Sequence, residues 1–257
     1  MIPVTIKKIS KGIRIVKDES LPELVRRAFQ YYLGDVYDRS IREHFPAIPV
    51  GYNGVNVRAL RMSDVILPRN NQYIRPSYET AICRQLRMWD LTGYDVCVLG
   101  AGWGVTSVVA AYQTGSGGRV ISYEASSKYA SRVRETAALN NCADRIFVRH
   151  GRVGPAINVY GEDDACSIAF GDLPDADCYV IDIEGAELTV LDDLPYRPEH
   201  LLVESHGLYG SPTDAVKNKI REMGYSITNC DVAESEPKIK EVCENNDVHV
   251  ISSTKAE

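Results

Sequence analysis

The segment Asp95–Gly104, DVCVLGAGWG, constrains the fold of this chain more than any other stretch. A mostly apolar run of strand length leads into a turn with glycine at Gly100, Gly102 and Gly104, and a helix-like segment, 105–113, follows. Glycine lets a backbone pass close to a ligand and adopt angles that other residues avoid. The succession of strand, glycine turn and helix therefore indicates a nucleotide-binding turn. The alternative is a tight strand-to-helix turn that holds no ligand.

An acidic residue follows the turn at a spacing that suits a ribose. The next apolar strand, Arg119–Tyr123, ends at Glu124, twenty positions after Gly104. A carboxylate there can accept hydrogen bonds from the ribose hydroxyls, as in the dinucleotide fingerprint. That fingerprint needs a third glycine three positions after the second, and Val105 stands there. The loop instead resembles the S-adenosylmethionine loop of class I methyltransferases.

The overall composition narrows the class of protein. A chain of 257 residues suits one α/β domain plus an extension. The net charge of -6 argues against nucleic acid as a partner, because phosphate binding needs a basic face. The seven cysteines form no C-x-x-C pair, which predicts a reducing, cytoplasmic compartment and no structural zinc. We expect neither a membrane span nor a signal peptide.

Residues 1–76 are predicted to form an N-terminal extension of a helix and a hairpin, and residues 77–257 the main domain. Helical spacing of apolar residues predicts a helix over Leu21–Leu33, capped by Ser20. Two prolines make 44–51 a connector, and alternation predicts a hairpin within 55–67. The extension is interpreted either as a lid or substrate collar, or as an appendage packed on the sheet edge.

From Ser77 onward, which is predicted to open a helix, strand and helix patterns alternate. This alternation predicts an α/β fold with a doubly wound, mostly parallel sheet. Residues 234–247 read as a charged loop, so the last two strands are expected to form an antiparallel hairpin without a helix between them. Ser211 is expected to cap the last predicted helix. Strands are predicted at 95–99, 119–123, 146–150, 178–183, 201–204, 225–228 and 248–251, with a short extra one at 166–170.

Ligands of open α/β sheets bind beyond the carboxyl ends of the strands. The candidate site residues therefore follow those ends. The predicted contacts of the cofactor are Glu79, Gly100, Ala101, Gly102, Gly104, Glu124, Ala125, Arg152 and Asp182.

The segment Asp182–Glu187, DIEGAE, places three carboxylates within six residues after a buried strand. Like charges this close need water, a cation or a positively charged ligand. S-adenosylmethionine carries a sulfonium and an ammonium group and is a suitable partner. Glu187 is interpreted either in that way or as a first-turn carboxylate that offsets a helix dipole. The same two interpretations hold for Glu79, with the amino group of a bound amino-acid moiety as its ligand.

Four segments in this order resemble the FkbM family of S-adenosylmethionine-dependent methyltransferases: GAGWG at 100–104, YEA at 123–125, IDIEGAE at 181–187 and VESH at 203–206. The resemblance spans roughly residues 78–251. It implies a seven-stranded sheet with an antiparallel last strand. It also implies methyl transfer to a hydroxyl group of a small-molecule or carbohydrate-like acceptor. One position departs from the pattern, since Val98 replaces an acidic residue, whose charge Glu79 or Asp182 would have to supply.

These observations predict O-methylation by direct in-line transfer, in which the protein mainly aligns donor and acceptor. His206 is our first expectation for the base that takes the hydroxyl proton, and Glu184 the second. A metal-assisted version would bring Asp182, Glu204 and His206 together with Glu184 around a magnesium-like ion. Because no ligand spacing requires such an ion, no metal is predicted.

Two other functional classes are alternatives to this prediction. A protein that binds the cofactor or a nucleotide without catalysis is favoured by Val98. Methylation of a nucleic-acid base is disfavoured, because the chain lacks an Asn/Asp-Pro-Pro-aromatic loop after the fourth strand and is acidic. The sequence predicts neither the methyl acceptor nor the oligomeric state.

Overall fold

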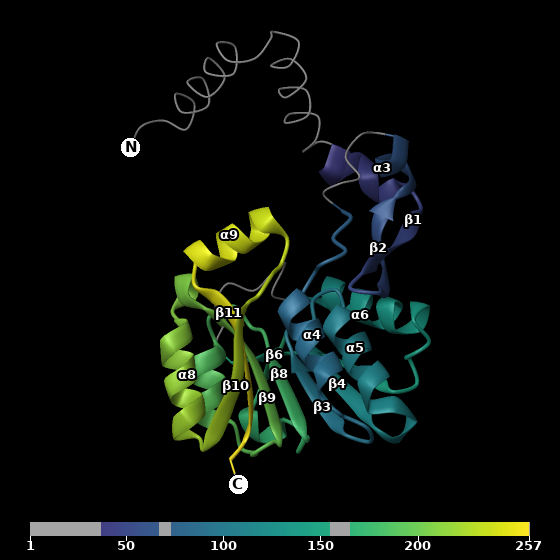
Figure 1. The fold of residues 1–257 in the computed structure, drawn as a ribbon. Coiled ribbons are helices and arrows are strands. Elements are labelled where there is room, and N and C mark those ends of the chain that lie inside the picture. Colours follow the sequence, from purple (N-terminus) through teal and green to yellow (C-terminus); the bar gives the residue numbers. More distant parts are fainter. Residues whose placement is uncertain (1–36, 67–72, 155–164, 257) are drawn as a thin grey trace, which may run out of the picture. The chain divides into compact units, whose positions relative to one another are not determined.

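The computed structural model describes residues 37–66, 73–154 and 165–256 of the chain (Figure 1). It divides into two compact units, Met1–Ile48 with Ala59–Tyr73 and Pro49–Arg58 with Ile74–Glu257. The helix predicted over Leu21–Leu33, with its cap Ser20, lies outside the described residues.

The described part of the first unit is organised around a buried carboxylate. Asp64 lies in the short helix α3 (Met62–Ile66) and its side chain is fully buried. It accepts hydrogen bonds from the guanidinium of Arg42 and from the Tyr37 hydroxyl at 2.8 Å. Burial by itself would raise the pKa of Asp64, but these donors hold it below its ordinary value. These hydrogen bonds and the ion pair with Arg42 compensate for the burial of the ionised Asp64 carboxylate.

A hairpin is present, but only one of its two strands, the one that begins at Val55, was predicted. Strands β1 (Ala47–Tyr52) and β2 (Val55–Arg61) form a two-stranded sheet. Asn53 and Gly54 join them with φ of 49° and 79°, as a two-residue hairpin turn requires. The connector predicted over 44–51 was therefore wrong, because a two-stranded sheet accepts Pro49 where a central strand would not. The strand predicted at 65–66 lies in α3 instead.

The second unit contains the predicted mostly parallel sheet. Its seven strands lie in the order β10-β11-β9-β8-β3-β4-β5. Strand β11 runs antiparallel to both of its neighbours, β10 and β9, whereas β9, β8, β3, β4 and β5 pair in parallel. The prediction of a seven-stranded sheet with an antiparallel last strand is confirmed. The strands are β3 (Asp95–Leu99), β4 (Arg119–Glu124), β5 (Ile146–His150), β8 (Cys178–Ile181), β9 (His200–His206), β10 (Tyr225–Val232) and β11 (Val248–Lys255).

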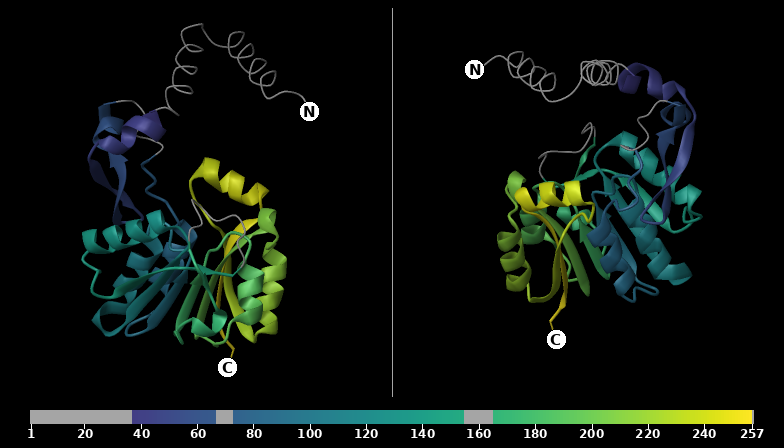
Figure 2. Two further views of the ribbon diagram at one scale, coloured as in Figure 1. Left: turned by 180° about the vertical axis from the view of Figure 1, so that it is seen from behind. Right: turned by 45° about the horizontal axis from the view of Figure 1, so that its top comes forward.

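Helices pack against the sheet in two groups (Figure 2). In the first group, α5 (Val105–Thr114) packs on β3, β4 and β5, and α6 (Ser127–Leu139) packs on β4 and β5. Helix α4 (Thr80–Met88) packs on α5 and contacts β11. The second comprises α7 (Glu187–Asp193) and α8 (Thr213–Glu222), and α8 packs on β9, β10 and β11. The strands between them are apolar, and those in the middle, such as β8, are buried throughout.

Two predicted helix starts were wrong, and one helix was not predicted. Helix α4 begins at Thr80 rather than at Ser77, because Glu79 takes a left-handed conformation with φ of 54°. Helix α8 begins at Thr213, and Ser211 instead pairs with His206 in an isolated β-bridge. The loop predicted at 234–247 contains helix α9 (Pro237–Asn245), which joins β10 to β11. Cys243 is its only buried residue, and most of its other residues are charged or polar, which is why the segment was interpreted as a loop.

Two strand ends also differ from the prediction. Strand β8 stops at Ile181, so Asp182 lies just beyond it. Strand β9 continues to His206, so this histidine is a buried strand residue rather than a loop residue. The extra strand predicted at 166–170 is reduced to β7 (Ser167–Ile168), which pairs with β6 (Arg152–Val153).

The core is as apolar as the strand patterns indicate. Tyr179, Leu99, Ile181 and Leu201 are fully buried at its centre. The seven cysteines are all free thiols, and Cys97 and Cys178 are buried as predicted. Among the described residues, none of the helices combines the length and apolar character that a membrane crossing requires.

Gly100→Ala is predicted to destabilise the fold by about 3–5 kcal/mol, through left-handed strain and overpacking together. Gly100 has φ of 83°, and an added Cβ would lie 1.7 Å from the backbone oxygen of Asp182. Gly210→Ala is the matched control, because Gly210 also has positive φ but no atom lies near its missing Cβ. Urea unfolding should give the control a loss of only about 1–2 kcal/mol. Equal losses for the two variants would contradict the close approach.

Candidate functional site

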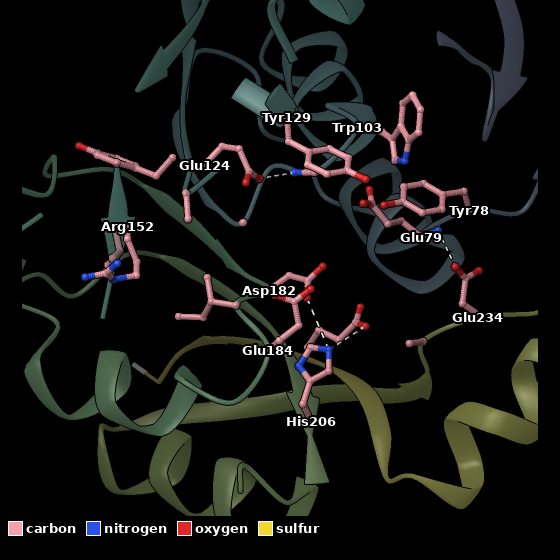
Figure 3. A pocket seen from close by; sticks show the side chains of 18 of the residues that line it. Tyr78, Glu79, Trp103, Glu124, Tyr129, Arg152, Asp182, Glu184, His206 and Glu234 are labelled. Carbon is pink, nitrogen blue, oxygen red and sulfur yellow. Dashed lines mark hydrogen bonds and ion pairs between the residues drawn. The ribbon is translucent and has the colours of Figure 1, made fainter. Parts of the chain in front are cut away.

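A cavity of about 250 Å³ lies at the carboxyl ends of β3, β4, β8 and β9 (Figure 3). Its volume is close to the lower end of the usual range for ligand pockets, about 300 Å³. The residues around it are mostly polar or aromatic. The polar, aromatic and glycine residues that line it include Arg75, Tyr78, Glu79, Gly100, Gly102, Trp103, Glu124, Tyr129, Arg152, Asp182, Glu184, Glu204, His206 and Glu234.

The glycine turn contributes three residues with three different roles. Gly100 allows the contact with the Asp182 backbone described above. Gly102 borders the cavity, where an added Cβ would lie 3.4 Å from the Tyr78 hydroxyl. Gly104 does not line the cavity, since its missing Cβ faces Val133 of α6 at 3.0–3.3 Å. Predicted contact Ala101 is also absent from the cavity lining and is fully buried.

Glu124, at the end of β4, faces the glycine turn and lines the cavity. Its two carboxylate oxygens accept hydrogen bonds from the backbone of Gly102 and Ser126, both at 2.9 Å. Burial raises the pKa of Glu124, while these two amides act in the opposite direction. Each oxygen keeps a second lone pair, so the carboxylate can still accept a ligand hydroxyl. Ala125 lies next to it in the cavity wall.

Glu79 reaches the cavity from the start of α4, and it does not offset the dipole of its own helix. One of its carboxylate oxygens accepts hydrogen bonds from the Thr106 backbone, at 3.2 Å, and hydroxyl, at 2.5 Å. Thr106 lies in the first turn of α5, where a negative charge is favourable. Burial nevertheless raises the pKa of Glu79 to about 7. The carboxylate therefore changes charge near neutral pH.

His206 and Glu187 form a buried pair at the floor of the cavity. The Nδ1 atom of His206 lies 2.6 Å from Oε1 of Glu187, which is fully buried. Glu187 also accepts hydrogen bonds from the Gly185 backbone amide at 3.0 and 3.1 Å. An acceptor with those contacts requires Nδ1 to carry the proton, which leaves Nε2 facing the cavity.

The pair also sets the charge state of both groups. Burial alone would raise the pKa of Glu187, but the hydrogen bond from His206 makes it lower than usual. Burial alone would lower the pKa of His206, but Glu187 and Asp182 make it higher than usual. The sequence allows two interpretations of Glu187, as a partner of a positive ligand or as a first-turn carboxylate. In the structure it lies in the first turn of α7 and pairs with His206.

Two more carboxylates lie beside His206 Nε2. An oxygen of Asp182 is 3.7 Å from it and an oxygen of Glu204 is 3.6 Å from it. The ligand atoms of these three residues all lie within 4.8 Å of one another, so they could hold a metal ion as well as a positively charged organic ligand. Burial raises the pKa of both carboxyl groups well above their ordinary values.

Glu184 stands at the turn after β8 with φ of 31°. It lines the cavity, and burial together with the nearby charges of Glu124 and Glu187 raises its pKa to about 7. The predicted cofactor contact Arg152 lines the cavity at the start of β6. His150 is exposed at the end of β5 and lies 3.2 Å from the Ala125 carbonyl oxygen.

Aromatic rings form the opposite wall, which the sequence analysis missed. Trp103 meets Tyr129 edge to face, with ring centroids 6.0 Å apart, and Tyr78 lies beside them (Figure 3). The guanidinium of Arg132 stacks over Trp103 at 4.2 Å. Trp103 follows Gly102 directly, and this position within the turn was the available signal. A flat apolar ligand surface would fit such a wall.

Glu234 was also missed, because it precedes α9 in a segment that read as a solvated loop. One of its oxygens accepts hydrogen bonds from the Glu79 backbone at 3.2 Å and from Arg75 at 3.1 Å. Its other oxygen is buried without a hydrogen-bond partner among the described residues. Burial raises the pKa of Glu234. This contact ties the segment before α9 to the start of α4.

No family model matches the chain, and no curated protein matches it. Solved structures resemble it at low identity. An O-methyltransferase from Bacillus cereus in complex with SAH is 18% identical with a TM-score of 0.46, covering 68% of this chain and 81% of that one. A precorrin-6y C5,15-methyltransferase from Geobacter metallireducens GS-15 is 16% identical with a TM-score of 0.47, covering 69% and 86%. A ribosomal protein L11 methylase from Lactobacillus delbrueckii subsp. bulgaricus is 12% identical with a TM-score of 0.48, covering 70% and 79%.

Glu79→Gln is predicted to remove a pH dependence from the stability of the ligand-free protein. The pKa of Glu79 is about 7 in the folded chain against an ordinary 4.5. The folded state therefore holds this proton more tightly, and stability is lost as the pH rises from 4.5 through 7. Urea unfolding at pH 5 and pH 8 should show the wild type losing about 2 kcal/mol relative to the variant. A difference that stays constant over that range would contradict the buried position.

Proposed function

We propose that this chain is an S-adenosylmethionine-dependent methyltransferase that methylates a hydroxyl group of a small-molecule or carbohydrate-like acceptor. The observation that carries the proposal is the meeting, in one cavity, of the glycine turn, Glu124 and a cluster of buried carboxylates. The carboxylates suit a cofactor with a sulfonium and an ammonium group. The FkbM resemblance of the sequence is the reason for preferring a hydroxyl acceptor.

The proposed cofactor would lie across the ends of β3 and β4. Glu124 would accept the ribose hydroxyls, with Gly102 leaving room for the backbone of the turn to approach. Glu79 and Asp182 would face the positive groups of the methionine part. Arg152 and Ala125 stay proposed contacts on the side of β5 and β6.

In this arrangement Glu79 and Asp182 can supply the negative charge that the FkbM pattern has at the position of Val98. Val98 itself is buried inside β3 and does not line the cavity. Glu79 and Asp182 both line the cavity. They lie at the start of α4 and just after β8, and not in β3. Their positions support a cofactor site despite the departure from the FkbM pattern.

Methyl transfer needs little covalent help from the protein. The oxygen of the acceptor attacks the methyl carbon, the carbon–sulfur bond breaks, and its electron pair leaves with sulfur as a neutral thioether. The hydroxyl proton must go to a nearby group, and we propose His206 and Glu184 as the residues that activate the hydroxyl. Both line the cavity, and Glu187 holds the imidazole in one orientation.

S-adenosylhomocysteine is predicted to raise the melting temperature of the protein, whereas NAD and ATP should not. A ligand that binds only the folded state stabilises it by an amount set by its concentration relative to Kd. Glu124→Gln should weaken S-adenosylhomocysteine by about 10–100-fold, since a charged hydrogen bond is lost. Glu199→Gln, an exposed change outside the cavity, is the control. An equal shift by NAD would count against the proposed cofactor.

His206→Ala and Glu184→Gln are predicted to lower turnover by about 10²–10⁴-fold while leaving S-adenosylhomocysteine affinity nearly unchanged. The measurement is S-adenosylhomocysteine formation over a panel of monosaccharides and other small hydroxyl compounds, with Glu199→Gln as control. Unchanged turnover in either variant would remove that residue from the mechanism. Binding of S-adenosylhomocysteine without methyl transfer to any acceptor would favour a protein that binds the cofactor without catalysis.

A further inference from the structure

The immediate surroundings of His206 Nε2 lack a hydrogen-bond partner. The imidazole side chain is only 9% exposed, and its Nδ1 is committed to Glu187. Nε2 makes no hydrogen bond with any described residue. It faces Asp182 (Figure 3) and also lies close to Glu204. A neutral imidazole with its proton on Nδ1 presents the Nε2 lone pair to both carboxylates, and either a proton on Nε2 or a cation among the three groups offsets that repulsion.

The distances from Nε2 distinguish direct hydrogen bonds to the two carboxylates from shared coordination of a cation. Nε2 lies 3.7 and 3.6 Å from the oxygens of Asp182 and Glu204, which is too long for hydrogen bonds of about 2.7–3.2 Å. Two ligands of one cation, each about 2.2 Å from it, lie about 3.1 Å apart at a right angle and about 3.6 Å apart at the tetrahedral angle. The observed separations fit two donors that share an ion.

The excess of negative charge around the cavity also favours a bound cation. Six carboxyl groups line it, against two arginines and His206. One arginine, Arg75, already pairs with Glu234 at 3.1 Å. S-adenosylmethionine would bring a net charge of only about +1 and does not balance this excess.

We infer that Asp182, Glu204 and His206 bind a divalent cation, with Glu187 orienting the imidazole from behind. One imidazole and two carboxylates suit first-row ions such as Mn²⁺. A ligating histidine characteristically donates its other N–H to a carboxylate, and His206 does so to the fully buried Glu187. Three protein ligands leave positions open for a further oxygen.

The cation would explain how the acceptor is activated, and this role rests on the proposed function. A hydroxyl group in an open position would lose its proton more readily. Glu184, two residues after Asp182 and outside the ligand set, would take that proton. The alkoxide oxygen would then form its bond to the methyl carbon as the carbon–sulfur bond breaks. His206 would thus activate the hydroxyl as a ligand rather than as a base.

The test is a Mn²⁺ titration of the EDTA-treated full chain without cofactor, followed by electron paramagnetic resonance. One Mn²⁺ per chain is expected, with a nitrogen ligand visible by electron spin echo. Glu204→Gln should weaken binding at least tenfold, and Glu187→Gln by about 10–100-fold through the orientation of His206. Glu124→Gln is the matched control, a carboxylate of the same cavity outside the ligand set, and should keep the ion.

Absence of Mn²⁺ binding, or binding that Glu204→Gln leaves unchanged, would overturn the inference. If that variant does not fold, the nitrogen signal of the wild type decides, because a surface ion held only by carboxylates would lack it. The outcome is separate from that of the proposed function. Mn²⁺ binding without an effect of S-adenosylhomocysteine would keep the cation site and reject the methyltransferase, and the reverse result would reject the cation site alone.

Discussion

Mutual repulsion among buried carboxylates is the constraint on which the rest of the site depends. Glu79, Asp182, Glu204 and Glu234 come from four separate segments and line the same cavity. Two of them are held by specific donors, Glu79 by the first turn of α5 and Glu234 by Arg75. Burial raises the pKa of all four. A positive ligand or protons must therefore balance them, and this requirement selects cationic ligands over anionic ones.

Asp182 and Glu204 come together because the parallel strands that precede or carry them end at the same edge of the sheet. The carboxyl ends of β8 and β9 lie side by side, with Ile181 in register with Val203, so the residues that follow face one edge. Gly100 lets the end of β3 touch the Asp182 backbone, which a side chain would prevent. The turn therefore serves close strand packing at Gly100, and Gly100, Gly102 and Trp103 all line the cavity.

Sequence periodicity predicted the positions of the strands along the chain well, because buried parallel strands read as continuous apolar runs. It failed where tertiary contacts override local patterns. Glu79 adopts a left-handed conformation that delays α4, and its contact with Glu234 joins segments 155 positions apart. The candidate residues Glu124, Asp182 and Glu184 followed from their positions at strand ends, since topology alone places them. The pairing of Glu187 with His206 depends on side-chain direction, which spacing does not encode.

Val98 shows why one substitution in a motif need not remove its chemistry. The side chain at this position is almost fully buried within β3, whose register places it beside Ser122 and Val180. An ionised carboxylate there would need a partner that those neighbours do not offer. The chain instead brings acids from α4 and β8, where the start of α5 and the imidazole of His206 face them. The charge of the cavity therefore depends on how these elements meet, and not on β3 alone.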